Sequence, residues 1–374
     1  MWVFYLASVL PLIPATYLLY KHKEIVWYEW LGSFGIGLLL AAAFHLLAVT
    51  GMTYDTETWS GRVESTTYYP KWVERYTETI TETVRDSKGN TKTKTRKETR
   101  YRTHGPDWVA YTDLGYNIDI SSDTFEDIKN KFGGKVEVKQ PWKSGFHSGD
   151  KNTYSVNNNT GYLMPVNIHK SFENRVKAAP SLFSFAPIPK DAKVYPYPKN
   201  DNIFRSDRLV GNASNYISAL EMDRLNARLG GDKKVNIILV GFDKGTDPMN
   251  AVFQQSAWIG GKKNDIVICY GGGDGNNPPQ WVRTFGWTEE ELCKQNLNTL
   301  LLKHPINNDV LDIIETEVRK NYRIKDWSKF DYITVEPPTW SYIVYFIMLP
   351  MVQIGFWVFA YQNEYQKSFI HQWR

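Results

Sequence analysis

Three long apolar runs without Asp, Glu, Lys or Arg bracket one large polar segment of this chain. The runs cover residues 2–20, 31–52 and 337–363. A helix of about 20 apolar residues crosses the hydrocarbon core of a membrane. The pattern therefore predicts three transmembrane helices, embedded in a lipid bilayer, and one large polar segment over residues 53–336 on one side of it.

The first run is expected to stay in the protein as a membrane span. A signal peptide carries positive charge before its apolar core, whereas here the basic cluster at residues 21–23 follows the run. Basic residues beside a span favour the cytoplasmic side. We therefore expect a cytoplasmic loop over residues 21–30 and a cytoplasmic tail over residues 364–374. The N-terminus and the polar segment are then extracytoplasmic.

Few polar side chains interrupt the apolar runs. His45 lies in the second run, and an ionisable group at membrane depth is a candidate functional residue; the alternative is a neutral imidazole that hydrogen-bonds to a neighbouring span. Pro350 and Gln353 predict a kink with a polar partner in the third run. The small residues around Gly32–Gly37 favour close helix packing. Spans so poor in charge favour an anchor over a pore.

Residues 71–107 alternate in the period of two that is typical of strands, with many threonines, and predict a long β-hairpin. Residues 86–90 are the expected turn. Folding the chain about residue 88 places Glu82 opposite Lys94 and Glu74 opposite Arg102. Opposite charges across strands stabilise a pair by roughly 0.2–1 kcal/mol, so the charge pattern predicts the register.

The second strand of this hairpin is basic. Its cations are candidates for contact with an anionic partner in the envelope; the alternative is a solvated face that the sister strand neutralises. The candidate residues are Lys92, Lys94, Arg96, Arg100 and Arg102.

The middle of the chain shows weaker sequence signals for secondary structure. Asp123 and Glu126 are spaced as a capping box that opens a short helix, which ends at Gly133 and Gly134. Residues 135–208 are rich in Pro and Asn with little periodicity, which predicts an irregular connecting segment.

From residue 209 onward the pattern alternates between helices and apolar strands, which predicts an α/β sandwich. A helix from Ser214 to Leu229 precedes buried strands over residues 235–241 and 265–270, and residues 280–285 are a candidate third strand. Between them, Asp247 and Pro248 mark a helix start. Thr288 with Glu291 is a second capping box, and residues 306–322 form a long amphipathic helix.

Two apolar strands flank a helix that ends in Ser256-Ala257-Trp258-Ile259-Gly260, and Lys263-Asn264 lead into the second strand. In these features residues 209–322 resemble a TPM domain. This resemblance implies a membrane-tethered α/β unit outside the cytosol, with phosphatase or assembly roles. The glycine-rich run of residues 271–279 departs from the family pattern. The chain as a whole also resembles membrane proteins of large tailed bacteriophages.

The glycine-rich run follows a predicted strand, where ligands bind in open α/β sheets. Asp243, Asp247 and Asp274 could meet there and hold a hard cation such as Ca²⁺ or Mg²⁺; the alternative is a surface turn. No other set of residues indicates a catalytic centre. Cys269 and Cys293 are expected to be buried free thiols, with one bridge as the alternative.

The chain has 44 Lys and Arg against 40 Asp and Glu, a net charge of +4 that does not indicate a nucleic-acid partner. We therefore expect an α+β membrane protein with three transmembrane helices, an extracytoplasmic β-hairpin region and a TPM-like α/β sandwich. The expected parts are residues 1–20, 21–30, 31–52, 53–134, 135–208, 209–336, 337–363 and 364–374.

The expected function is binding or assembly in the cell envelope, with a membrane or envelope protein as partner. One alternative is a metal-dependent phosphatase-like hydrolase that uses the acidic residues at the sheet edge. The other is a component of an oligomeric membrane channel or lysis machine, in which the chain is a homo-oligomer and His45 is a sensitive position.

Overall fold

The computed structural model of the chain describes residues 2–10, 12–13, 16–17, 27–85, 91–139, 146–149, 152–199 and 202–362. These residues divide into two compact units. The first unit comprises residues 1–57, 171–187 and 326–374, and the second comprises residues 58–170 and 188–325. Most of the expected cytoplasmic loop, the tail over residues 364–374 and the hairpin turn lie outside the described residues.

Two helices of the first unit, α3 (Trp27–Thr53) and α10 (Thr339–Gln362), are long and apolar enough to cross a membrane. In each helix, only 17% of the most apolar stretch of 18 residues is buried. Leu39 and Leu47 of α3 are 72% and 71% exposed. A core helix of a soluble domain would bury such side chains, and their exposure fits the length and composition of a membrane-crossing helix.

The expectation of three long apolar helices is wrong for the described residues, which contain two. In the first apolar run the helix α1 (Trp2–Ala7) ends after six residues. The sequence offers a physical reason, since prolines occupy positions 11 and 14. A proline removes a backbone donor, and its ring clashes with the carbonyl four residues earlier, which for Pro11 is that of Ala7.

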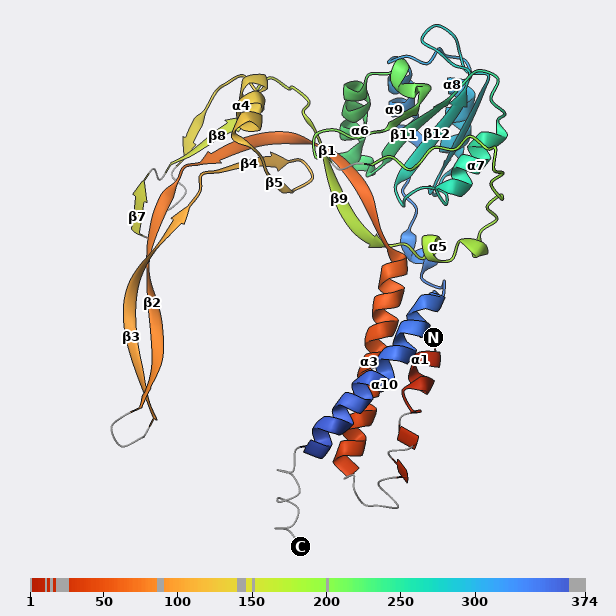
Figure 1. Ribbon diagram of the computed structural model, residues 1–374. Coiled ribbons are helices and arrows are strands. Elements are labelled where there is room, and N and C mark those ends of the chain that lie inside the picture. Colours follow the sequence, from red (N-terminus) through yellow and green to blue (C-terminus); the bar gives the residue numbers. More distant parts are fainter. Residues whose placement is uncertain are drawn as a thin grey trace. The chain divides into compact units, whose positions relative to one another are not determined.

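The helices α1, α3 and α10 pack against one another through a cluster of mostly aromatic and aliphatic side chains, and through polar contacts (Figure 1). Gln353 of α10 is buried, accepts a hydrogen bond from the Ser33 hydroxyl, and donates one to the Ser33 carbonyl oxygen at 2.9 Å. A side chain at Gly37 would meet the Ser8 carbonyl oxygen at 3.1 Å. The polar partner expected for Gln353 and the close packing expected from the small residues are thus confirmed.

His45 lies close to an aromatic side chain of α1. Its ring lies 6.3 Å from that of Tyr5, and its Nδ1 atom is buried without a hydrogen-bond partner in the described part of the chain. The side chains around His45 in its own helix are Leu, Ala and Phe, which offer no polar group.

The rest of the first unit is short and held by polar contacts. It contains α5 (Arg175–Ala178), η1 (Pro180–Leu182) and η3 (Trp327–Phe330). Arg175 donates from Nη1 to the carbonyl oxygens of Asp331 and Ile333 at 2.8 and 3.0 Å. Asn174 donates to the buried Asp55 carboxylate at 2.8 Å. These bonds join the segments that precede α10 and follow α3.

The second unit contains a six-stranded sheet built on the long strand β1 (Tyr54–Tyr69). The order is β5-β4-β1-β8-β6, with β9 also paired to β1. The other strands are β4 (Asp107–Thr112), β5 (Asn117–Asp119), β6 (Glu137–Lys139), β8 (Thr153–Asn157) and β9 (Pro165–Glu173). Segment 135–208, expected to be irregular, therefore supplies three strands of this sheet. These strands are short, or they pair with β1, which is distant in the sequence. Local periodicity does not reveal such pairing.

Helix α4 (Ser122–Lys131) covers this sheet with Phe125 and Ile128. The expected capping box is placed two residues off. Ser121 is the N-cap and accepts a hydrogen bond from the Thr124 backbone N–H at 3.1 Å. Its backbone is extended, as a cap residue requires, while Asp123 already lies inside the first turn.

The predicted hairpin is present as β2 (Trp72–Arg85) and β3 (Thr91–His104), and β7 (Phe146–Gly149) pairs with the other edge of β2. The register is the predicted one, with Glu74 opposite Arg102 and Glu82 opposite Lys94. The ion pairs, however, are diagonal. Glu82 binds Arg96 at 3.3 Å and not Lys94 directly across.

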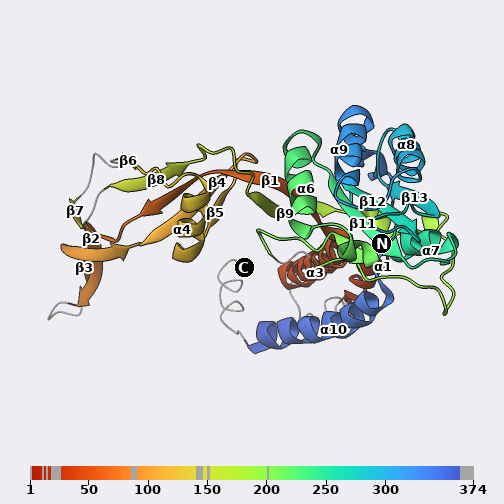
Figure 2. The same cartoon turned by 90° about the horizontal axis from the view of Figure 1, so that it is seen from above.

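The α/β part of the second unit is a four-stranded sheet with helices on both faces, as expected (Figure 2). Its order is β10 (Leu209–Gly211), β11 (Asn236–Phe242), β12 (Asp265–Gly271) and β13 (Trp281–Gly286). The first three strands are parallel, and β13 is antiparallel to β12.

Two apolar layers hold this sheet between its helices. On one face, side chains of β11 and β12 pack with α6 (Ala219–Lys233), α8 (Glu291–Leu301) and α9 (Val310–Asn321). On the other, they pack with α7 (Met249–Ala257) and Trp258. Cys269 and Cys293 are free and belong to opposite layers, which confirms the expected free thiols. Burial raises the pKa of Cys293 to about 12.

The helix starts predicted at Asp247 and Thr288 have different outcomes. Asp247 accepts a hydrogen bond from the Met249 backbone N–H at 2.8 Å, as expected for the start of α7. The capping box at Thr288 is wrong. Its hydroxyl donates to the Arg323 carbonyl oxygen at 2.9 Å, and α8 begins at Glu291 without a side-chain cap. The Thr288 hydroxyl accepts a hydrogen bond from the Glu290 backbone N–H at 3.3 Å, so it bonds to the turn before α8 as well as to the distant carbonyl group.

A fully buried arginine connects the two sheets of the second unit. Arg208 binds the Asp223 carboxylate through Nη1 and the Asn236 side-chain oxygen through Nε. Its Nη2 donates to the Ser60 hydroxyl at 2.6 Å and to Asn167 at 2.8 Å. Ser60 belongs to β1 and Asn167 to β9, so one guanidinium binds elements of both sheets. Burial lowers the pKa of Arg208 and raises that of Asp223, and the opposite charges oppose both shifts.

Candidate functional site

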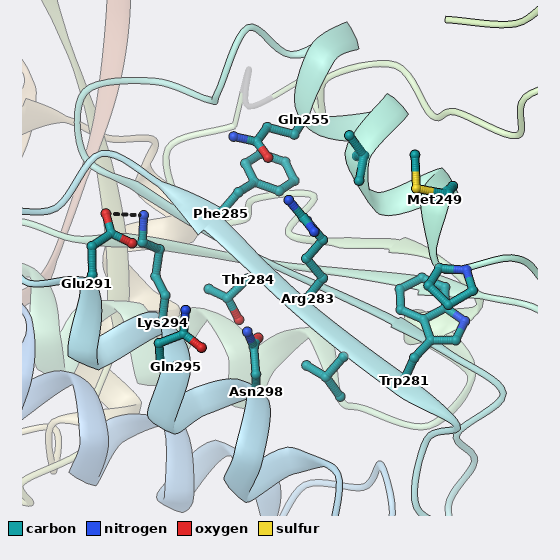
Figure 3. A pocket seen from close by; sticks show the side chains of 13 residues that line it. Met249, Gln255, Trp281, Arg283, Thr284, Phe285, Glu291, Lys294, Gln295 and Asn298 are labelled. Atoms are coloured by element: carbon teal, nitrogen blue, oxygen red, sulfur yellow. Dashed lines mark ion pairs between the residues drawn. The ribbon is translucent and has the colours of Figure 1, made fainter. Parts of the chain in front are cut away.

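A groove of about 530 Å³ follows the outer edge of the four-stranded sheet. We call it the β13 groove. Its volume falls in the range of small-molecule and peptide sites, about 300–1,000 Å³. The lining residues come from α7, β13 and α8 (Figure 3): Pro248, Met249, Val252, Gln255, Trp281, Val282, Arg283, Thr284, Phe285, Glu291, Lys294, Gln295 and Asn298.

The floor of the groove is an edge strand. Within the described residues, β13 pairs with β12 on one side and with no strand on the other. The backbone of an edge strand has unpaired N–H and C=O groups along its open side. The β13 groove therefore offers a row of main-chain donors and acceptors between two helices.

Side chains of β13 alternate between the two walls. Arg283 and Phe285 project to the side of α7, where the Arg283 guanidinium points toward Gln255 (Figure 3). Thr284 projects to the side of α8, close to Asn298. This alternation is the ordinary period of two in a strand, and it gives the groove an apolar wall at Met249 and a wall of amides on α8.

Three polar groups in the groove have no partner within the described chain. Thr284 is 8% exposed, and its hydroxyl makes no hydrogen bond. The Asn298 side-chain oxygen is buried and likewise unpaired. The exposed Arg283 forms no ion pair or hydrogen bond there. Buried polar groups are nearly always satisfied in folded proteins, so these two atoms mark a place where a ligand or water belongs.

Neighbouring contacts hold the frame of the groove in place. The Trp281 indole donates to the Thr246 carbonyl oxygen at 2.8 Å, which joins β13 to the loop before α7. Lys294 donates to the Gly286 carbonyl oxygen at 3.2 Å and pairs with Glu291 at 2.8 Å. Since Glu291 and Lys294 neutralise each other, Arg283 supplies the uncompensated charge of the groove.

The three aspartates predicted as a cation site are each engaged locally. Asp243 pairs with Lys193, and this bond raises the pKa of the lysine. Asp247 caps α7. Asp274 accepts hydrogen bonds from the backbone N–H groups of Asn276 and Asn277, both at 2.8 Å, which lower the pKa of its carboxyl.

The described residues contain no group of three His, Cys, Asp or Glu that could hold a metal ion. The glycine-rich run is a turn closed by Asp274, whose carbonyl oxygen also accepts from the Ile306 N–H at 2.8 Å. A site for Ca²⁺ or Mg²⁺ at these aspartates thus remains a prediction without geometric support from the described chain.

The hairpin cations divide into paired and unpaired residues. Arg96 pairs with Glu82 at 3.3 Å and Arg100 with Glu78 at 2.8 Å. Arg102 lies over the Tyr76 ring, 5.8 Å from its centre. Lys94 is exposed and has no ion pair within the described chain. The side chain of Lys92 lies outside the described part of the structure. The sister strand therefore neutralises part of the basic strand.

No sequence pattern singled out Arg283, Thr284 or Asn298. The strand that holds two of them was expected, but its place at the sheet edge was not. One signal was available, because a single arginine interrupts the run Trp-Val-Arg-Thr-Phe at residues 281–285. A charge in a short apolar strand favours an edge or a site over a central strand.

Comparison of the chain with protein-family models, curated proteins and solved structures gives no match. The resemblance to TPM domains therefore remains a prediction from the residues that carry it.

Proposed function

We propose that this protein is a membrane-anchored binding protein that takes up an extended segment of a partner protein in the β13 groove. The observation that supports this proposal is the open edge of β13 between α7 and α8. An extended peptide that adds to a sheet edge gains affinity from main-chain hydrogen bonds and specificity from pockets for alternate side chains. The β13 groove has both kinds of group.

The charge of the groove favours an acidic segment. Arg283 is exposed and unpaired within the described chain, while Lys294 is neutralised by Glu291. A carboxylate on the bound strand would pair with the Arg283 guanidinium. The apolar wall at Met249 and Val252 would take β-branched side chains, and the amides of Gln255 and Gln295 would meet main-chain groups.

Peptide binding by the full-length protein in detergent tests this proposal. The probes are two labelled peptides that alternate Val with Glu and Val with Lys. We expect the Val/Glu peptide to bind more tightly, and Arg283→Ala to weaken it about tenfold or more, because a hydrogen bond to a charged group contributes about 1.5–3 kcal/mol.

Two controls isolate the mode of binding. The variant Lys303→Ala removes an exposed cation outside the groove and should leave the affinity unchanged. A Val/Glu peptide with N-methylated backbone amides keeps its side chains and loses the donors for strand pairing, so it should bind poorly. Equal binding of the Val/Glu and Val/Lys peptides, or full binding of the N-methylated peptide, would contradict the proposal.

We further propose that residues 53–336 lie outside the cytosol. The charge pattern supports this orientation, since the basic residues near the apolar helices then fall on the cytoplasmic side. The two native cysteines are buried, so a new surface cysteine can be labelled selectively. In intact cells, an impermeant maleimide should label Lys135→Cys and should reach Lys367→Cys only after permeabilisation. The reverse pattern would refute the orientation.

A further inference from the structure

An uncharged apolar loop follows α5 in the first unit. Residues 179–187, which we call the apolar loop, read Ala-Pro-Ser-Leu-Phe-Ser-Phe-Ala-Pro and contain the short turn η1. No residue of this loop is buried, and Leu182 is 64% exposed. Contiguous apolar residues on a surface mark a contact with another protein or with a membrane.

The composition of the apolar loop fits a lipid surface. No charged residue occurs between Lys177 and Lys190. Segments that lie in the membrane interface combine Leu and Phe, which enter the boundary between headgroups and acyl chains, with Lys or Arg beside them. The apolar loop has Leu182, Phe183 and Phe185 at its centre and a lysine beyond each end, so a bilayer matches it better than a polar protein surface.

Hydrogen bonds attach the start of the apolar loop to the end of α3. The Asn174 backbone N–H donates to the carbonyl oxygen of Thr53, the last residue of α3, at 2.6 Å. The Lys177 ammonium donates to the Tyr54 carbonyl oxygen at 3.2 Å. With 27 residues, α3 is about 40 Å long, which matches the hydrocarbon core together with its headgroup layers, about 40–45 Å. A bilayer around α3 therefore has a headgroup layer close to Thr53 and to the start of the loop.

The segment that leads into α10 holds the apolar loop as well, and Figure 1 shows α5 between this segment and the end of α3. The rings of Phe183 and Phe330 meet edge to face, with their centres 6.1 Å apart. Arg175 binds the two carbonyl oxygens on either side of Tyr332. Tyr332 itself is 77% exposed. Tyrosine is enriched at membrane surfaces, so an exposed side chain of the interfacial type lies beside α5.

The backbone limits the depth that the apolar loop can reach. Outside η1 its residues form no helix or strand. Backbone N–H and C=O groups without partners do not enter the hydrocarbon core. The side chains of the loop can therefore reach the outer parts of the lipid chains, while its main chain stays among headgroups and water.

We propose that the apolar loop docks on the lipid surface next to α3, with Leu182 and Phe185 at the boundary between headgroups and acyl chains. The partner is the bilayer that receives α3 and α10, so this inference rests on the membrane anchoring proposed above. It depends neither on the side of the membrane nor on peptide binding in the β13 groove. Interfacial anchors help to set the tilt of spanning helices, so the loop helps to set the tilt of α3.

Spin labels on the full chain in lipid nanodiscs test this contact. The native cysteines are buried, so a label attaches to a new surface cysteine. Molecular oxygen concentrates among acyl chains, whereas a water-soluble nickel chelate stays outside them. We expect oxygen to relax the label of Leu182→Cys more than the nickel chelate does. The label of Lys303→Cys, at an exposed position outside the loop, should show the reverse.

The variant Met351→Cys separates this inference from the anchoring on which it rests. Met351 lies inside α10 and is 63% exposed, so a membrane around α10 makes its label accessible to oxygen alone. A Met351 label in lipid together with a Leu182 label in water would overturn the docking of the loop and leave the anchor intact. A Met351 label in water would refute the anchoring and this inference together. A Leu182 label that neither reagent reaches would show cover by protein and would also overturn the inference.

Three further variants guard against a change in folding at Leu182. Ser184→Cys places the label at a second exposed position of the loop and should give the result of Leu182→Cys. Leu182→Cys/Phe185→Asp adds a charge, which disfavours the acyl boundary, so its label should move toward water. The matched Leu182→Cys/Lys303→Asp should keep its label in lipid. An unchanged label position in Leu182→Cys/Phe185→Asp would contradict docking through this loop.

Discussion

Arg208 and Asp223 form an ion pair of 2.8 Å in which the arginine side chain is fully buried and the aspartate is 3% exposed. Both charged groups are shielded from water and contact each other. The arginine also donates hydrogen bonds to neutral side chains of β1, β9 and β11. Removal of one member of such a pair is costly, because the other charge stays buried and unpaired.

Arg208→Met should therefore destabilise the protein by about 3–5 kcal/mol. The variant leaves the Asp223 carboxylate without its cation and the Ser60 hydroxyl without its donor, while Asn167 keeps the hydrogen bond from Ser60. Arg208→Met/Asp223→Leu should cost less than the single change, since no charge remains buried. Denaturant unfolding followed by tryptophan fluorescence measures these differences.

The control for this prediction is Arg319→Met. Arg319 pairs with Glu315 and Asp232 on the surface, with its side chain 41% exposed. Exposed pairs contribute about 1 kcal/mol or less. An equal loss of stability in Arg208→Met and Arg319→Met would show that the buried network contributes nothing specific.

The buried carboxyl group of Asp265 predicts the direction in which the stability of the protein changes with pH. Its buried carboxylate accepts hydrogen bonds from Asn236, Tyr197 and the Lys262 backbone N–H. Burial nevertheless raises its pKa above 3.8. The folded chain then binds a proton that the unfolded chain releases, so this contribution to stability is complete below pH 3.8 and is lost as the pH rises through the folded pKa.

The measurement compares wild type with Asp265→Asn, which does not titrate at this position. The melting temperature of the wild type, relative to that of the variant, should rise as the pH is lowered from 7 toward 4. Effects of all other groups are common to both proteins and cancel in the difference. A difference that is constant, or that falls on acidification, would contradict the raised pKa.

The contact between Ser33 and Gln353 predicts coupling between α3 and α10. Two hydrogen bonds join these buried residues. Such interhelical bonds contribute about 0.6 kcal/mol on average in a membrane protein, with a maximum of about 1.7 kcal/mol. A double-mutant cycle with Ser33→Ala and Gln353→Leu, measured by unfolding in bicelles, should give a coupling in this range. Strict additivity of the two single changes would refute a direct contact.

Much of the architecture was readable because it depends on neighbours in sequence. The period of two and the charge order between residues 71 and 107 predicted both the hairpin and its register. The apolar strands of residues 235–241 and 265–270 and the cap at Asp247 were equally local signals. Where a local pattern failed, as at Thr288, the helix began further along the chain, at Glu291, and the threonine joined the turn before it to the distant Arg323 carbonyl group.

The sequence by itself determined two of the three expected apolar helices, the hairpin register and the order of elements in the α/β part, because each follows from hydrophobic pattern, charge spacing or turn residues. Only the tertiary structure decided that β13 is an edge, that Thr284 and Asn298 lie together in a groove, and that Arg208 is buried. Those facts depend on residues far apart in the chain. An arginine in a segment without periodicity has the same local pattern whether it is solvated or enclosed, and only packing distinguishes the two.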